Sequence, residues 1–185
     1  MERGKLVLVG GGVRSGKSAL SLRLAAQLGA RRAFVATAHA GDDEMRARIE
    51  RHRRERAGAF DSVEAPLELA GALESLTGYD AVVVDCVTHW LTNLLLAEHA
   101  TEAILRRVEV VVEVLRTAAF HTVLVTNEVG MSIHPETALG RAFVEVAGFA
   151  NQRFARASDD VYFSVMGAVL PVRTSSRPPL LDVTL

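Results

Sequence analysis

The sequence lacks a second cysteine, a substantial net charge and a long apolar run. Its single cysteine, Cys86, excludes an intrachain disulfide, and without a CxxC partner we interpret this thiol as a buried apolar residue. A formal net charge of −1 provides no overall field to attract nucleic acid or an anionic membrane, although the basic segment 51–56 can still act locally. We therefore expect no nucleic-acid partner.

No membrane-spanning or secretory segment is evident in the sequence. No apolar run approaches the roughly 20 residues that a bilayer-spanning helix requires, and the first residues show no charged and then apolar leader. We therefore expect a cytoplasmic protein with no membrane span. Apolar residues make up 49% of the chain, which at this length is enough for a sizeable core. We expect one domain over residues 1–185.

Short β-branched runs alternate with longer helical patterns along the chain. The runs are almost continuously apolar, which is typical of strands buried on both faces of a parallel sheet. Strands are predicted over residues 5–10, 33–38, 81–86, 122–127 and 161–166, and helices over residues 17–28, 42–56, 67–76, 89–99, 102–119 and 139–158. This order predicts a doubly wound α/β fold. Prolines limit the tail from Ala168 to an edge strand or a surface segment.

The strongest motif is GGVRSGKS, Gly11 to Ser18, which fits the G-x-x-x-x-G-K-[ST] pattern of a phosphate-binding P-loop. It follows a predicted strand and opens a predicted helix, as this loop requires. Its N–H groups can surround a phosphate, Lys17 can reach the β- and γ-phosphate oxygens, and Ser18 can bind Mg²⁺. Arg14 is either a further cation near the phosphates or a solvated side chain. The alternative for the whole motif is a glycine-rich turn before Lys-Ser.

The motif narrows the predicted fold to the P-loop NTPase-like (RecA-like) α/β class, with a mostly parallel sheet and helices on both faces. Asp85 ends a predicted strand, so its carboxylate would lie close to the P-loop and hold Mg²⁺ directly or through water. The alternative is that Asp85 caps the helix that follows. Thr126, Asn127 and Glu128 end another strand, where they either contact substrate or form a capping turn.

His52 lies in the basic segment MRARIERHRRER, residues 45–56. On a helix it shares one stripe with Met45, Ile49 and Arg56, so one interpretation is an inward-facing core or capping histidine. If a nucleoside triphosphate binds beside it, a second interpretation is favoured, in which His52 is a nucleophile. Its neutral imidazole can attack a phosphorus because the surrounding arginines offset the charge of the phosphate. Covalent nucleotidyl transfer by His52 is therefore physically possible.

Other histidines have no partnering motif. We interpret His89, His99 and His121, which lie at predicted element boundaries, as structural or surface residues. His134 either contacts substrate or lies in a surface turn. His52 is thus the histidine that the sequence favours for chemistry.

Four longer segments of the sequence together resemble one known protein family. They are GGVRSGKS, ATAHAGDDEMRARIERHRRER, VVVDCVTHWLTNLL and VTNEVGMSIHPETALGRAFVEVAGFANQRFA. Together, from about Leu6 to Met166, they resemble the bifunctional adenosylcobinamide kinase/adenosylcobinamide-phosphate guanylyltransferases of cobalamin biosynthesis. The resemblance implies that ATP or GTP phosphorylates the aminopropanol arm of adenosylcobinamide. It also implies that GMP then passes from GTP to the new phosphate through a guanylyl-histidine at His52, giving adenosylcobinamide-GDP and pyrophosphate.

The resemblance also implies site residues and partners. His52 and Lys17 would be catalytic, and Ser18 and Asp85 would hold Mg²⁺, the expected cofactor. The expected nucleotide contacts are Gly11, Gly12, Val13, Arg14, Ser15, Gly16, Lys17, Ser18, Thr37, Ala38, His39, Arg53, Arg54, Glu55, Arg56, Glu64 and Asp85. Ala38 and His39 replace a more polar pair, and Asp85 stands where a longer glutamate is common. The expected partners are a corrinoid, GTP and ATP, and the expected assembly is a homotrimer.

Two functions from other classes remain compatible with the sequence. A simple P-loop small-molecule kinase needs the P-loop but no covalent histidine. A nucleotide-gated binding or assembly protein binds GTP without converting a corrinoid. A GMP adduct on the protein distinguishes the guanylyltransferase from the first alternative, and a corrinoid product distinguishes it from the second.

Overall fold

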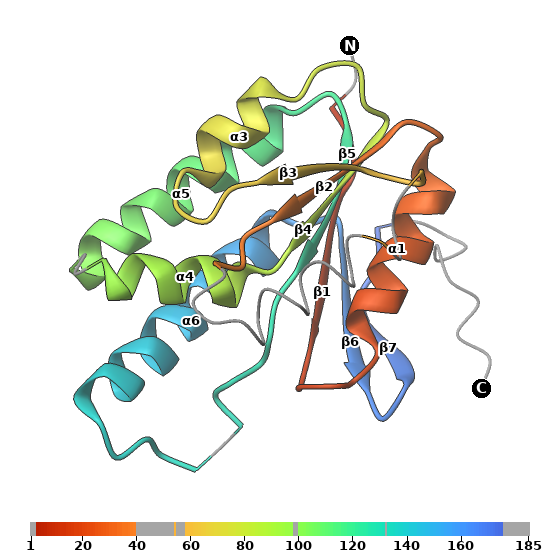
Figure 1. The fold of residues 1–185 in the computed structure, drawn as a ribbon. Helices are drawn as coiled ribbons and strands as arrows, with labels where there is room; N and C mark the ends of the chain where they lie inside the picture. The colour runs from red at the N-terminus through yellow and green to blue at the C-terminus, as the bar shows by residue number, and fades with distance from the viewer. Residues whose placement is uncertain (1–2, 40–53, 55–57, 98–99, 132, 176–185) are drawn as a thin grey trace.

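The computed structural model describes residues 3–39, 54, 58–97, 100–131 and 133–175. Within these ranges, seven strands form one sheet in the order β3-β2-β4-β5-β1-β6-β7 (Figure 1). The strands are β1 (Leu6–Gly11), β2 (Arg32–Ala36), β3 (Asp61–Glu64), β4 (Ala81–Asp85), β5 (His121–Val125), β6 (Asp160–Val165) and β7 (Ala168–Arg173). Every neighbouring pair is parallel except β6 with β7. The predicted mostly parallel sheet is confirmed.

Helices cover both faces of this sheet, as predicted. Helix α1 (Lys17–Leu28) lies on one face, and the other face carries α3 (Leu69–Ser75), α4 (Val87–Leu96), α5 (Thr101–Thr117) and α6 (Ala138–Ala157) (Figure 1). None of these described helices combines the length and the apolar character needed to cross a membrane. A single domain over all of residues 1–185 stays a prediction.

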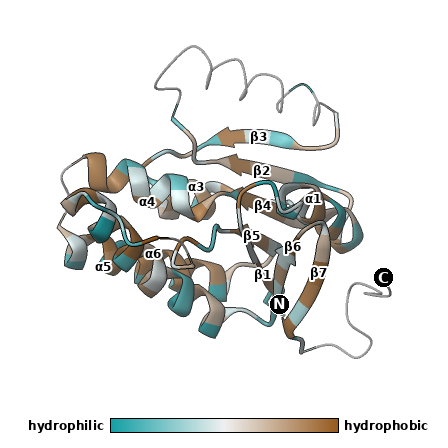
Figure 2. Ribbon diagram, turned by 90° about the horizontal axis from the view of Figure 1, so that it is seen from below, coloured by the Kyte–Doolittle hydropathy of each residue, from teal (hydrophilic) through white to brown (hydrophobic). Residues whose placement is uncertain are grey.

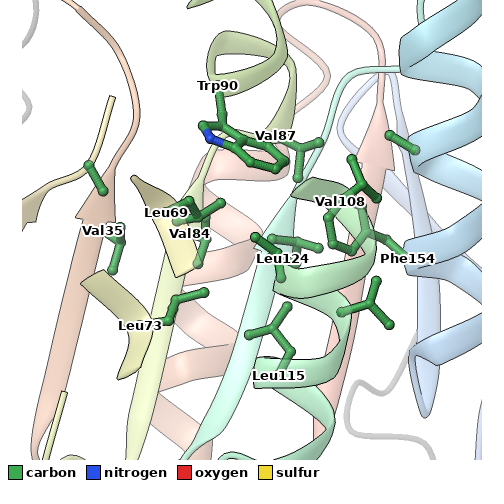
Figure 3. Close-up of a cluster of buried hydrophobic side chains, with 14 of the residues drawn as sticks. Val35, Leu69, Leu73, Val84, Val87, Trp90, Val108, Leu115, Leu124 and Phe154 are labelled. Atoms are coloured by element: carbon green, nitrogen blue, oxygen red, sulfur yellow. The ribbon is translucent and has the colours of Figure 1, made fainter. Parts of the chain in front are cut away.

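Strand β1 shows why the central strands are apolar throughout. Leu6 and Leu8 belong to the core cluster that includes α3 to α6, whereas Val7 and Val9 belong to the cluster that includes α1. Because helices cover both faces, neither face of the strand is available for solvated side chains. Figure 3 shows part of the larger cluster, in which Leu124 of β5 packs with residues of the covering helices.

The sequence did not reveal β3. This strand is short and three of its four residues are exposed, so it carries no apolar run. It forms because it pairs in parallel with β2, from Ala33 opposite Asp61 to Ala36 opposite Glu64, at one end of the sheet (Figure 2). The helix predicted over residues 42–56 lies outside the described residues except for Arg54, which is helical. The other predicted elements are present, with ends displaced by a few residues.

Strand β7 confirms the edge-strand alternative for the tail. It is the last strand in the sheet order, so the missing N–H of Pro171 deprives no further strand of a hydrogen bond. The β6–β7 turn has left-handed backbone at both of its central residues, Met166 (φ 51) and Gly167 (φ 81). This is the geometry of a two-residue hairpin whose twist matches that of its strands.

Asp159 fastens the beginning of β1 to the α6–β6 connection. Its carboxylate accepts hydrogen bonds from the backbone N of Leu6 and from Nη1 of Arg3, both at 2.9 Å. The Arg3 hydrogen bond is the main reason why the pKa of Asp159 lies below its ordinary value. The carboxylate therefore stabilises the fold in its charged form.

Asp159→Asn should make unfolding less dependent on pH. Because folding lowers the pKa of Asp159, its contribution to stability is present above the unfolded pKa of about 4 and is lost as pH falls through the folded pKa. We expect the variant to lose about 1–2 kcal/mol of unfolding free energy at pH 7 and much less at pH 3. Urea unfolding at both pH values measures this, with Glu74→Gln, an exposed carboxylate, as control. An equal loss at both pH values would contradict the assignment.

Candidate active site

The P-loop and Asp85 meet at one edge of the sheet. Strand β1 ends at Gly11, and α1 begins at Lys17. The strand β5 lies between β1 and β4, and the register aligns Val9, Val125 and Asp85 across the three strands. Because the strands are parallel, the loop after β1 and the end of β4 lie at the same carboxyl edge. The sequence-based expectation that these segments come together is confirmed.

Two glycines give the P-loop its tight conformation. Gly16, the residue before α1, has a left-handed φ of 98°. A Cβ atom on Gly11 would lie only 2.3 Å from the carbonyl oxygen of Ser164 on β6, so no larger residue fits there. Arg14 also has a positive φ, of 57°, at the exposed part of the loop. The loop thus has the backbone that the GGVRSGKS motif predicts.

Lys17 lies over the P-loop with little contact with solvent. Its Nζ atom donates to the carbonyl oxygen of Gly12 at 2.8 Å, and the residue is 8% exposed. Burial lowers the pKa of Lys17, and the Cys86 sulfur and the Asp85 carboxylate oppose that shift. Burial and the same carboxylate raise the pKa of Cys86. The thiol is therefore neutral at pH 7, and Asp85 is the nearby anion that stabilises the Lys17 ammonium.

A pocket of about 440 Å³ joins the loop to the end of β4. We call it the P-loop pocket, and its lining is Val13, Arg14, Ser15, Gly16, Lys17, Ser18, Ala19, Asp85, Cys86, His89 and Asn127. A loop of N–H groups, two cations and a carboxylate suit a phosphate chain with a metal ion. The expected neighbourhood of Arg14, Lys17, Ser18 and Asp85 is thus present.

His89, which we predict from the sequence to be a structural or surface histidine, lines the P-loop pocket. It lies in the first turn of α4, four residues after Asp85, and its side chain is exposed. The first turn of a helix that follows the carboxyl end of a strand is a place where ligands bind in parallel sheets. That position, rather than a motif, is the signal that could have identified His89.

Asp85 does not cap α4, so the capping alternative is wrong. The N-cap residue of α4 is Cys86, and it makes no side-chain capping bond. Half-buried Asp85 instead shares the P-loop pocket with the Ser18 hydroxyl. Among the described residues no three His, Cys, Asp or Glu side chains gather as a metal site. Two oxygen donors fit Mg²⁺ that takes its other ligands from phosphates and water.

Thr37 has a structural role in holding Asp85 in place. Its hydroxyl donates to the carbonyl oxygen of Cys86 at 2.7 Å and accepts from the Cys86 backbone N at 2.8 Å. Asn93 of α4 donates to the carbonyl oxygen of Thr37 at 2.8 Å. These bonds join the end of β2 to the end of β4 and to α4. The hydroxyl is thus occupied, and a nucleotide contact by Thr37 stays a prediction.

The remaining expected nucleotide contacts follow β2, end β3, or belong to the segment 53–56, most of which lies outside the described residues. Ala38 and His39 follow β2, and Glu64 ends β3 at the same carboxyl edge, but none of these three lines the P-loop pocket. Arg54 is exposed. His52, Arg53, Glu55 and Arg56 lie outside the described residues. The nucleotide contacts of all these residues stay predictions.

The polar residues after β5 make structural contacts, and one of them also lines the P-loop pocket. Thr126 Oγ1 donates to Asn151 Oδ1 at 2.7 Å, and Asn127 Nδ2 donates to Thr88 Oγ1 at 2.8 Å. These bonds attach the end of β5 to α6 and α4. Because Asn127 also lines the P-loop pocket, the turn that these bonds fix still faces the site.

Comparison with known protein families shows where this chain belongs. A family model described as cobinamide kinase / cobinamide phosphate guanyltransferase matches residues 7–172. The chain belongs to this family. The resemblance that the sequence motifs carry is confirmed.

Two relatives of the family match the chain over nearly its whole length. The bifunctional adenosylcobalamin biosynthesis protein CobP of Pseudomonas aeruginosa is 40% identical over 167 residues, which cover 90% of this chain and 96% of the relative. The bifunctional adenosylcobalamin biosynthesis protein CobU of Salmonella typhimurium is 35% identical over 184 residues, which cover 91% and 99%. The family match thus includes the P-loop, β4 and β5 together.

Solved structures support the predicted fold. FlaH, a flagellar accessory protein of Methanocaldococcus jannaschii, superposes with a TM-score of 0.54 at 12% identity, over 97% of this chain and 82% of FlaH. The RadB recombinase superposes with a TM-score of 0.52 at 18% identity, over 97% of this chain and 85% of RadB. At such identities the likeness concerns the fold alone. It confirms the P-loop NTPase-like (RecA-like) class.

Thr37→Val should destabilise the fold more than Thr37→Ser. Valine leaves the buried N–H and C=O of Cys86 without their side-chain partner, which should cost about 1–3 kcal/mol of unfolding free energy. Serine keeps the hydroxyl and loses only a methyl group, which should cost less than about 1.5 kcal/mol. Urea unfolding and GTP titration of both variants measure this. If Thr37→Val weakened GTP binding without changing stability, the hydroxyl would be a nucleotide contact instead.

Proposed function

We propose that this enzyme phosphorylates adenosylcobinamide with ATP or GTP and then transfers GMP from GTP to adenosylcobinamide phosphate. The second step yields adenosylcobinamide-GDP and pyrophosphate. Membership of the cobinamide kinase / cobinamide phosphate guanyltransferase family supports both activities. The observation that carries the proposal is that, in a member of this family, Lys17, Ser18 and Asp85 share one pocket with the P-loop.

The kinase step is a matter of positioning and charge. We infer that the N–H groups of the P-loop and the Lys17 ammonium hold the β- and γ-phosphates, while Arg14 stabilises negative charge on the transferred group. Mg²⁺, held by Ser18 and Asp85, would neutralise further phosphate charge. The substrate hydroxyl then bonds to the γ-phosphorus, and the nucleoside diphosphate leaves.

The guanylyl step requires a nucleophile on the protein, for which we propose His52. Its neutral imidazole nitrogen attacks the α-phosphorus of GTP, a P–N bond forms, and the bond to pyrophosphate breaks. The phosphate of adenosylcobinamide phosphate then displaces GMP from His52. Two successive displacements predict net retention of configuration at phosphorus. The support for His52 is the family resemblance of its segment, together with the arginines around it.

We also propose a cytoplasmic homotrimer, with a corrinoid, GTP and ATP as its small-molecule partners. The cytoplasmic location follows from the nucleoside triphosphates that both steps consume. The trimer follows from the family resemblance, which places active sites near subunit borders. Both statements stay predictions.

Lys17→Ala should impair both reactions. The variant loses the buried ammonium that we assign to the triphosphate, so we expect kcat/KM to fall by about 100-fold or more in each step. Separate assays with adenosylcobinamide and with its phosphate, analysed by chromatography, measure the two products. Arg23→Ala, which removes an exposed cation from the same helix, serves as the control. Near-normal activity of folded Lys17→Ala would exclude this role for the P-loop lysine.

His52→Ala and His52→Asn should separate the two reactions. Both variants lack the nucleophile, so GMP transfer should disappear, whereas the P-loop remains and some kinase activity should persist. The same two assays measure this, and thermal unfolding verifies that the variants are folded. Equal loss of both activities in a folded variant would count against a role confined to guanylyl transfer. If a variant kept both its kinase activity and its full GMP transfer, His52 would instead be a structural residue.

A further inference from the structure

A second pocket, of about 540 Å³, borders the same P-loop. We call it the Met131–Met166 pocket. It shares Val13, Arg14 and Ser15 with the P-loop pocket. Its other lining residues are Gly12 of the P-loop, Glu128 and Met131 after β5, and residues 163–166, which end β6 and begin the β6–β7 turn. The two pockets therefore meet at residues 13–15.

Exposed apolar side chains surround the Met131–Met166 pocket. Val13 and Met131 are each 83% exposed, and Met166 is 95% exposed. Such a group of exposed apolar side chains beside a polar loop marks a binding surface, because covering it removes apolar area from water. Methionine side chains also adapt to ligands of irregular shape. The charged residues in the lining are Arg14 and Glu128.

Hydrogen bonds hold the wall formed by β6 against the P-loop. The hydroxyl of buried Ser164 and the backbone N of Gly167 both donate to the carbonyl oxygen of Ser15, at 2.6 and 3.2 Å. On the opposite flank of β1, the backbone N of Glu128 donates to the carbonyl oxygen of Gly11 at 3.2 Å. A ligand in the Met131–Met166 pocket would therefore have a fixed position relative to the phosphates.

Two other pockets of the described chain lie at the wrong edge of the sheet for the reaction. One is lined by Tyr79 and Phe120, which precede β4 and β5, and the other by Arg3 and Asp159, which precede β1 and β6. A strand of five residues is about 16 Å long, so a hydroxyl bound at that edge could not reach a phosphate on the P-loop. The end of β1 and the β6–β7 turn, in contrast, lie at the same edge (Figure 1).

We propose that the Met131–Met166 pocket receives the corrinoid acceptor, an inference that rests on the proposed function. The pocket is smaller than a whole corrinoid, so it takes the aminopropanol arm and the edge of the ring that carries it. Met131 and Met166 contact the methyl groups and ring carbons of that edge, and the Glu128 carboxylate accepts a hydrogen bond from the arm. The hydroxyl of the arm then reaches the γ-phosphorus beside residues 13–15, and its proton is released to solvent as the O–P bond forms.

The double variant Met131→Ser/Met166→Ser tests this assignment. We expect KM for adenosylcobinamide to rise by about tenfold or more, because the ring edge loses two apolar contacts. KM for GTP should stay within about twofold of the original value, since neither side chain lines the P-loop pocket. Met131→Leu/Met166→Leu keeps the apolar surface and should retain corrinoid affinity. Val110→Ser, which removes an exposed apolar side chain from α5, is the matched control.

Equilibrium dialysis gives the corrinoid affinity directly. It is carried out in the presence of a non-hydrolysable GTP analogue, and the absorbance of adenosylcobinamide reports binding. Unchanged corrinoid affinity in the double serine variant, with normal binding by the unmodified enzyme, would overturn the pocket assignment alone. Failure of the unmodified enzyme to bind or convert the corrinoid would overturn the proposed function as well.

Light scattering measures the oligomeric state of the unmodified enzyme and of the double serine variant. An oligomer that dissociates in the serine variant with unchanged corrinoid affinity would make this surface a contact between copies of the chain.

Discussion

The candidate active site depends on the parallel pairing of β1, β5 and β4. Only parallel strands bring the loop after β1 and the last residue of β4 to the same edge, where Lys17 and Asp85 share a pocket. Had β4 run the other way, its carboxylate would lie at the far edge. Helices cover both faces of the sheet, so the side chains of its central strands are buried on either side. The chemistry of the site is thus a consequence of how the core is packed.

Hydrogen bonds and charges near the P-loop then determine the position of Asp85 and affect the charge of Lys17. Thr37 and Cys86 join the ends of β2 and β4 through two hydrogen bonds, which fixes the position of Asp85. Burial lowers the pKa of Lys17, and the nearby Cys86 sulfur and Asp85 carboxylate oppose this shift without cancelling it. A lysine that keeps its charge in a partly dehydrated pocket interacts more strongly with phosphate than a solvated one does. The P-loop pocket is therefore prepared for an anion.

The parts of the fold and site that depend on local sequence could be predicted, and those that depend on distant partners could not. Apolar runs predicted the central strands, and GGVRSGKS predicted the P-loop, because its glycines meet backbone needs that the sequence itself reveals. Strand β3 is polar and forms only through its pairing with β2. The role of Thr37 depends on Cys86, far along the chain, and His89 reaches the pocket only through the sheet topology.

The guanylyl-histidine intermediate is the claim on which the mechanism depends most. It is tested most directly by incubating the enzyme with Mg²⁺ and GTP labelled at the α-phosphorus, followed by denaturation, intact mass measurement and peptide mapping. We predict an acid-labile adduct with the mass of GMP on the peptide that contains His52. Protein that binds GTP but forms no adduct would contradict the account and would leave a P-loop kinase or a nucleotide-binding protein.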